Sequence, residues 1–176
     1  MFPIHDQKGR VIAFGGRALD KDAPAKYLNS PDTPLFHKGE ILFNHHNARK
    51  AAHDKGRVIA VEGYVDVIAM SRAGFAHTVA PLGTALTEDQ VQLLWRMADE
   101  PILCFDGDRA GRKAAYRAIA KAAELIDMRK HKGEHPRFGA TDVCPFIPIA
   151  NATMEDCIAC AKKLGVTHQM NSTTQE

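Results

Sequence analysis

Short apolar runs alternate with amphipathic stretches between residues 57 and 128. The runs have the length and composition of strands buried in a parallel sheet, and the stretches carry apolar residues at helical spacing. We predict strands at 57–61, 77–80 and 101–105, and helices at 64–72, from 87 onward and at 110–128. This alternation predicts a parallel α/β sheet with right-handed crossovers.

Local signals support two of these helices. Thr87, with Gln90 three positions later, has the pattern of a capping box, and Gly74 is a typical residue just beyond a helix. Before residue 40 turn formers dominate, and 10–14 is the clear strand there. This part is expected to be a mixed β region with long ordered loops.

The pattern changes again after residue 128. A basic loop at 131–139 precedes a predicted strand at 142–149 and a predicted helix at 153–164. Asp156 is placed to help cap that helix, and Gly165 is expected to end it. The polar segment 168–176 is expected to be disordered.

Composition excludes several classes of protein. The 176 residues are 45% hydrophobic and 25% charged, which is typical of a globular domain, and the net charge of +2 does not by itself indicate a polyanionic partner. No apolar run is long enough to cross a membrane, and the first residues do not resemble a signal peptide. With four cysteines, we expect a cytoplasmic protein with reduced thiols and no contact with membranes.

Acidic residues directly follow two of the predicted strands. Glu62 comes after the first, and Asp106 and Asp108 come after the third. Because the carboxyl ends of parallel strands meet at one edge of a sheet, these carboxylates are expected to converge on one or two Mg²⁺ ions. Gly63 and Gly107 are expected to permit sharp turns beside them. The alternative for Asp108 is an ordinary helix cap.

Two motifs carry a resemblance to a known family. Residues 61–67, VEGYVDV, and 105–111, FDGDRAG, closely resemble the TOPRIM motifs of bacterial replicative DNA primase. Further segments resemble the same family in the same order, and they lie at 1–4, 14–17, 26–31, 37–39 and 82–85. The resemblance covers about residues 1–120. It implies a TOPRIM-type parallel sheet with flanking helices, preceded by a partial mixed α/β region and followed by a short α/β fragment.

The resemblance also implies an activity, which is synthesis of short RNA primers from ribonucleoside triphosphates on a single-stranded DNA template. Glu62 and Asp66 would act in catalysis, and Glu62, Asp106 and Asp108 would hold Mg²⁺ or Mn²⁺. The family's third acidic motif, of the Asp-x-Asp type, is not found after residue 127. The replicative helicase is a partner of the family, and its docking domain is expected to be absent here.

Five residues before the TOPRIM motifs match positions that line a groove for template and nascent RNA in that family. They are Arg17, Lys26, Tyr27, Asn29 and Lys38. Lysine and arginine neutralise phosphates, and a tyrosine ring can stack on a base. The alternative is that these are solvated surface charges.

A second resemblance begins near residue 120. Residues 131–146, HKGEHPRFGATDVCPF, look like the amino-terminal subdomain of glutamate formiminotransferase, and the match extends to about 165. It implies His135 as a catalytic acid/base and tetrahydrofolate as cofactor. The chain is thus an apparent chimera, and an inactive remnant is a further alternative. The expected domains are 1–38, the end of the primase amino-terminal subdomain; 39–119, TOPRIM; 120–167, formiminotransferase-like; and 168–176, the tail.

Overall fold

The computed structural model describes residues 1–20, 22, 25–83, 86–125 and 153–172. Residues 1–105 and 106–176 form two units. The first unit contains a four-stranded and a three-stranded sheet. In the described part of the chain no helix combines the length and apolar character that a membrane span requires.

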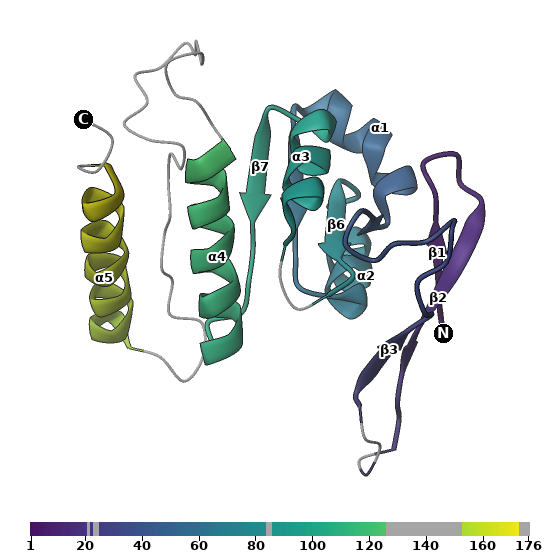
Figure 1. The fold of residues 1–176 in the computed structure, drawn as a ribbon, viewed down its shortest axis with the longest axis horizontal. Coiled ribbons are helices and arrows are strands. Elements are labelled where there is room, and N and C mark those ends of the chain that lie inside the picture. The colour runs from purple at the N-terminus through teal and green to yellow at the C-terminus, as the bar shows by residue number, and fades with distance from the viewer. Residues whose placement is uncertain (21, 23–24, 84–85, 126–152, 173–176) are drawn as a thin grey trace. The chain divides into compact units, whose positions relative to one another are not determined.

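The four-stranded sheet has the order β4-β6-β5-β7, and its strands β6 and β7 are labelled in Figure 1. Its strands are β4 (Leu42–Phe43), β5 (Arg57–Ala60), β6 (Thr78–Pro81) and β7 (Glu100–Leu103). β5 pairs with β6 and β7 in parallel, and β4 joins β6 antiparallel. The predicted parallel α/β sheet is confirmed. β7 is an edge strand of this sheet. Its Pro101 suits that position, because proline has no backbone N–H to donate to a neighbouring strand.

Three helices cover this sheet. They are α1 (His45–Lys55), α2 (Tyr64–Arg72) and α3 (Glu88–Met97). α1 and α3 pack on each other and on β5, whereas α2 packs on β6. The connections from β5 to β6 and from β6 to β7 run in opposite directions across the sheet, so right-handed crossovers place α2 and α3 on opposite faces.

The local signals for α2 and α3 are confirmed. Gly74 follows the end of α2 with a φ of 95°, the left-handed conformation that favours glycine. Thr87 accepts a hydrogen bond from the Gln90 backbone N–H, and the Gln90 side chain accepts one from the Thr87 N–H. Gly63, by contrast, is extended, with a φ of −151°. The expectation that it permits a sharp turn is therefore wrong, because any residue can adopt this conformation.

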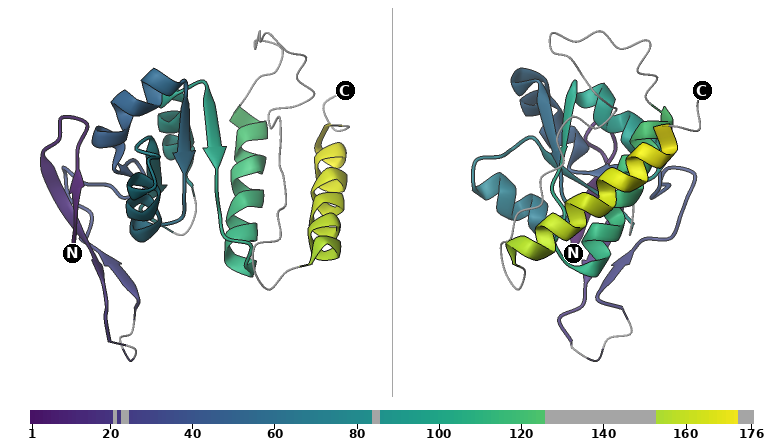
Figure 2. Two further views of the ribbon diagram at one scale, coloured as in Figure 1. Left: turned by 180° about the vertical axis from the view of Figure 1, so that it is seen from behind. Right: turned by 90° about the vertical axis from the view of Figure 1, so that its left-hand side faces the viewer.

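The three-stranded antiparallel sheet has the order β1-β2-β3, formed by Phe2–His5, Val11–Arg17 and Tyr27–Asn29. The turn between β1 and β2 lies beside α1 (Figure 2). His46 Nδ1 of α1 is 3.1 Å from the Gln7 carbonyl in this turn. The sequence pattern indicated one strand in this region, at 10–14, and missed β1 and β3. It also missed α1, whose buried side is formed by only a few residues, His45, Ala48 and Ala52.

The second unit contributes α4 (Arg109–Leu125) and α5 (Met154–Ser172). Thr153 and Asp156 form the expected cap of α5, since Asp156 Oδ2 accepts the Thr153 N–H at 2.9 Å. Gly165 does not end this helix, because a single interior glycine costs only about 1 kcal/mol relative to alanine. The helix also includes residues 168–172, for which we expected disorder. The strand expected at 142–149 lies outside the described residues.

Candidate nucleic-acid interface

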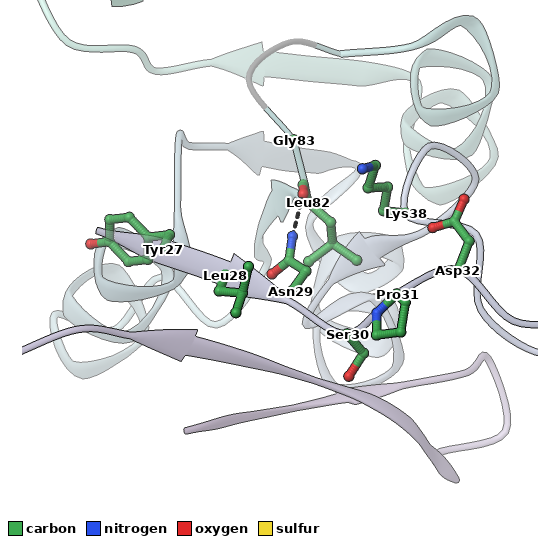
Figure 3. Close-up of a pocket in the computed structure, with 9 residues that line it drawn as sticks. All are labelled: Tyr27, Leu28, Asn29, Ser30, Pro31, Asp32, Lys38, Leu82 and Gly83. Carbon is green, nitrogen blue, oxygen red and sulfur yellow. Dashed lines mark hydrogen bonds between the residues drawn. The ribbon is translucent and has the colours of Figure 1, made fainter. Parts of the chain in front are cut away.

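A groove with a volume of about 470 Å³ opens between β3 and the turn after β6 (Figure 3). We call it the strand groove. One wall is formed by residues 27–32, the other by Leu82 and Gly83, and Lys38 also lines it. Three of the five residues predicted to bind nucleic acid, Tyr27, Asn29 and Lys38, line this groove. They come from separate parts of the chain, and the fold brings them together.

The other two predicted residues surround Tyr27. The Arg17 guanidinium and the Lys26 ammonium lie 5.9 and 5.8 Å from the centre of the Tyr27 ring. Arg17 is the direct cross-strand partner of Tyr27, so both side chains stand on one face of the sheet. Arg17 lines a separate depression with Gly16 and Leu28. The two cations and the half-exposed ring therefore form one positively charged edge.

Asn29 is held by protein partners on both sides of its amide. Its Nδ2 donates to the Leu82 carbonyl at 2.6 Å, and its Oδ1 accepts a hydrogen bond from the Tyr64 hydroxyl. Figure 3 shows the first of these bonds crossing the groove. An amide nitrogen carries two hydrogens, and the Leu82 carbonyl engages one of them. Asn29 thus has a structural role that the sequence pattern did not indicate.

The backbone beside Lys38 is fastened to α3. Gln90, whose side chain is 1% exposed, donates from Nε2 to the carbonyls of Lys38 at 2.9 Å and Ile41 at 3.0 Å. The Thr87 hydroxyl donates to the Gly39 carbonyl. The Lys38 side chain is exposed while its main chain is fixed. The sequence identified Gln90 as a capping residue, but its second role depends on contacts 52 and 49 positions away.

The acidic motif of the first unit lies at the end of β5. Glu62 is half-buried and directly precedes Gly63, the residue before α2. Asp66 Oδ2 accepts the Gly63 N–H at 3.0 Å, so the Asp66 carboxylate fixes the first turn of α2. Asp66 is otherwise exposed, and its charge at a helix N-terminus is favourable.

The acidic motif of the second unit precedes α4. Asp108 Oδ1 accepts the Gly111 N–H at 2.8 Å, so Asp108 caps the helix. Asp106 and Asp108 are exposed, and carboxylates of this kind are the ligands that Mg²⁺ prefers. Within the described ranges, no three His, Cys, Asp or Glu side chains form a group able to hold a metal ion. The cap uses Oδ1 of Asp108, and it does not prevent Oδ2 of the same carboxylate from acting as a metal ligand.

His135 lies outside the described residues. Around it, a family model for the amino-terminal subdomain of the formiminotransferase domain matches residues 103–174. Two further models match the earlier part of the chain. The amino-terminal domain of the DNA primase catalytic core matches residues 1–49, and a Toprim domain matches residues 56–130.

Curated relatives and solved structures agree with the two earlier matches. A DNA primase from Neisseria meningitidis serogroup A is 54% identical over 135 residues, which are 77% of this chain and 22% of that protein. The chain therefore spans about a fifth of the length of such relatives.

A crystal structure of a DNA primase domain from Pseudomonas aeruginosa has a TM-score of 0.67 at 50% identity, covering 72% of this chain and 39% of the other. A structure of the DnaG primase catalytic domain bound to ssDNA has a TM-score of 0.65 at 49% identity, covering 72% and 40%. By sequence and by fold, the first 130 residues of this chain are thus similar to the catalytic core of bacterial DNA primases, and residues 56–130 are similar to a Toprim domain.

Proposed function

We propose that this chain carries part of a DNA primase, which makes short RNA primers from ribonucleoside triphosphates on a single-stranded DNA template. The observation that supports this most directly is that the strand groove gathers Tyr27, Asn29 and Lys38 in a chain that is 54% identical to a primase over 77% of its length. A solved relative at 49% identity is described as bound to ssDNA. The nascent RNA and, in a complete primase, the replicative helicase are the further partners we propose.

The strand groove and the positively charged edge beside Tyr27 together have the chemistry that a single strand requires. Lys26, Arg17 and Lys38 offer positive charge to phosphates, and the half-exposed Tyr27 ring offers a surface on which a base can stack. The second amide hydrogen of Asn29 supplies a donor to a phosphate or a base edge. Asp32 also lines the groove, so binding depends on how these groups are placed and not on bulk charge.

We further propose that Glu62, Asp106 and Asp108 supply ligands to Mg²⁺ or Mn²⁺ and that Glu62 and Asp66 act in catalysis. The described residues do not form an assembled group of three carboxylates, so the support for this proposal is the match of both acidic motifs to a Toprim domain. Along the chain, Glu62 follows β5 and Asp106 follows β7. Carboxylates are the ligands that Mg²⁺ prefers in proteins. When bound, the cation would stabilise charge on the transferring phosphoryl group. Asp66 contributes by fixing the turn that follows Glu62.

The primase proposal is favoured over formimidoyl transfer. Identity to primases exceeds 50% over more than 120 residues, while the formiminotransferase similarity comes from one family-model match. His135 and tetrahydrofolate remain the residue and cofactor that the second function would require.

Replacing Lys26 and Lys38 together by alanine is expected to weaken binding of a fluorescein-labelled oligo(dT) by roughly tenfold at 50 mM salt, because each lysine that contacts a phosphate releases counterions. Fluorescence anisotropy over a salt series measures both the Kd and its salt dependence. The slope of log Kd against log salt should fall by about 0.7 for each contact that is lost.

The matched control is Lys8→Ala with Lys50→Ala, which removes the same charge at exposed sites outside both the strand groove and the charged edge beside Tyr27. Equal weakening in both double variants would show that binding responds to net charge alone, and the groove proposal would then be wrong.

Replacing Asp108 by asparagine is expected to reduce the rise in Tm that Mg²⁺ or Mn²⁺ produces in the parent chain. Asparagine caps a helix as well as aspartate does, so the bond to the Gly111 N–H is retained while the charge is lost. Thermal melts in 0 and 10 mM metal, together with calorimetric titration of Mn²⁺, measure the effect. Asp99→Asn, at an exposed residue after α3, is the control. An identical metal response in parent and Asp108→Asn chains would contradict a metal role for Asp108.

A further inference from the structure

Tyr64 lies at the centre of an aromatic cluster that joins the two sheets of the first unit. Its ring stacks on Phe2, with centres 4.7 Å apart and planes 6° apart, and meets Phe43 edge-on at 4.6 Å. A Cβ atom on Gly15 of β2 would come within 2.5 Å of the Tyr64 phenol. The ring is therefore fixed in position from several sides, and only 6% of the residue is exposed.

The Tyr64 hydroxyl starts a chain of hydrogen bonds that crosses the strand groove. It donates to Asn29 Oδ1, and Asn29 Nδ2 donates to the Leu82 carbonyl. Asn29 belongs to one groove wall and Leu82 to the other. These two hydrogen bonds thus connect the start of α2, two residues after Glu62, with both walls of the strand groove.

This arrangement also fixes the orientation of the Asn29 amide. A phenol that donates to Oδ1 leaves Nδ2 directed at the Leu82 carbonyl, whereas the flipped amide would place Oδ1 against that carbonyl, oxygen to oxygen. Burial raises the pKa of Tyr64 to about 12, so the hydroxyl keeps its proton at neutral pH. The donor that orients Asn29 is therefore present at neutral pH.

We propose that Tyr64 is a positioning residue for the strand groove, because its hydroxyl holds Asn29 against Leu82 and so sets the spacing of the two groove walls. This inference rests on the proposed strand-binding function. Tyr64 is only 6% exposed, which leaves little of its surface for a contact with the strand. It acts through Asn29, and it links the loop that carries Glu62 to the wall that carries Tyr27.

Tyr64→Phe tests the inference, because it removes the hydroxyl and keeps the packed ring. The Kd for fluorescein-labelled oligo(dT) is expected to rise by roughly 2- to 10-fold, which corresponds to the net free energy of one hydrogen bond. The salt slope should be unchanged, since no phosphate contact is lost. In an Asn29→Ala background, Tyr64→Phe should have no further effect on Kd, because the residue through which it acts is gone. Tyr116→Phe, which removes a tyrosine hydroxyl bond to Cys160 in the second unit, is the control and should bind like the parent.

Four outcomes would overturn the inference. They are a Tyr64→Phe Kd within error of the parent value, independent and additive effects of Tyr64→Phe and Asn29→Ala, a lowered salt slope, and loss of the folded state. The last would indicate a purely structural tyrosine. Failure of the parent chain to bind oligo(dT) would instead contradict the strand-binding function itself, and the inference with it, so the two failures are distinguishable.

Discussion

Replacing Gln90 by leucine is expected to lower the free energy of unfolding by roughly 3 to 6 kcal/mol. Leucine fills a similar volume but cannot donate to the carbonyls of Lys38 and Ile41 or accept from the Thr87 N–H. Each backbone group left without a partner costs about 1–3 kcal/mol. Because total stabilities of domains are about 5–15 kcal/mol, much of the variant should be unfolded at 37 °C.

Urea denaturation followed by circular dichroism measures this loss. Gln92→Leu is the matched control, because Gln92 lies on the same helix and is exposed. It should change the free energy of unfolding by less than about 0.5 kcal/mol. Similar urea midpoints for the two variants would show that the Gln90 bonds do not stabilise the fold, and would remove the reason we give for the fixed backbone at Lys38.

Replacing Gly15 by alanine is expected to destabilise the first unit by roughly 2 to 3 kcal/mol. The new methyl group would lie 2.5 Å from the Cζ and hydroxyl oxygen of Tyr64, closer than packed atoms can approach. The Tyr64 ring cannot easily move, because Phe2 and Phe43 pack against it. Any displacement of the phenol also weakens its bond to Asn29, so oligo(dT) binding should fall as well.

Gly16→Ala provides an adjacent control. A methyl group there meets only the Leu28 carbonyl at 3.7 Å, an ordinary contact, so the free energy of unfolding should be nearly unchanged. Chemical denaturation of both variants measures the difference. Equal stabilities would contradict the close packing of Tyr64 on β2.

Several local features of this protein could be predicted from the sequence because they depend on neighbouring residues. The Thr87–Gln90 capping box closes within one helical turn, and the left-handed Gly74 follows directly from the end of α2. The strands at residues 57–60, 78–81 and 100–103 were visible as short apolar runs. Periodicity also predicted the parallel sheet, since strands that alternate with helices need crossover connections.

Other features could not be predicted in this way. The chain order β5, β6, β7 differs from the spatial order β6-β5-β7, and nothing local marks β5 as the central strand. The two glycines at 15 and 16 appear in the sequence as turn formers, yet both lie within β2, where Gly15 provides the space that Tyr64 fills. Gly165 likewise appears as a helix end and is an interior residue of α5.

The sequence by itself determined the class of fold, the positions of the acidic motifs after their strands and the identity of the basic residues near β3. The tertiary structure alone decided which of these residues share a groove and what holds them there. The physical reason is distance along the chain. The bonds that build the groove join Asn29 to Tyr64 and to Leu82, 35 and 53 positions away, and such pairings form only when the sheets pack.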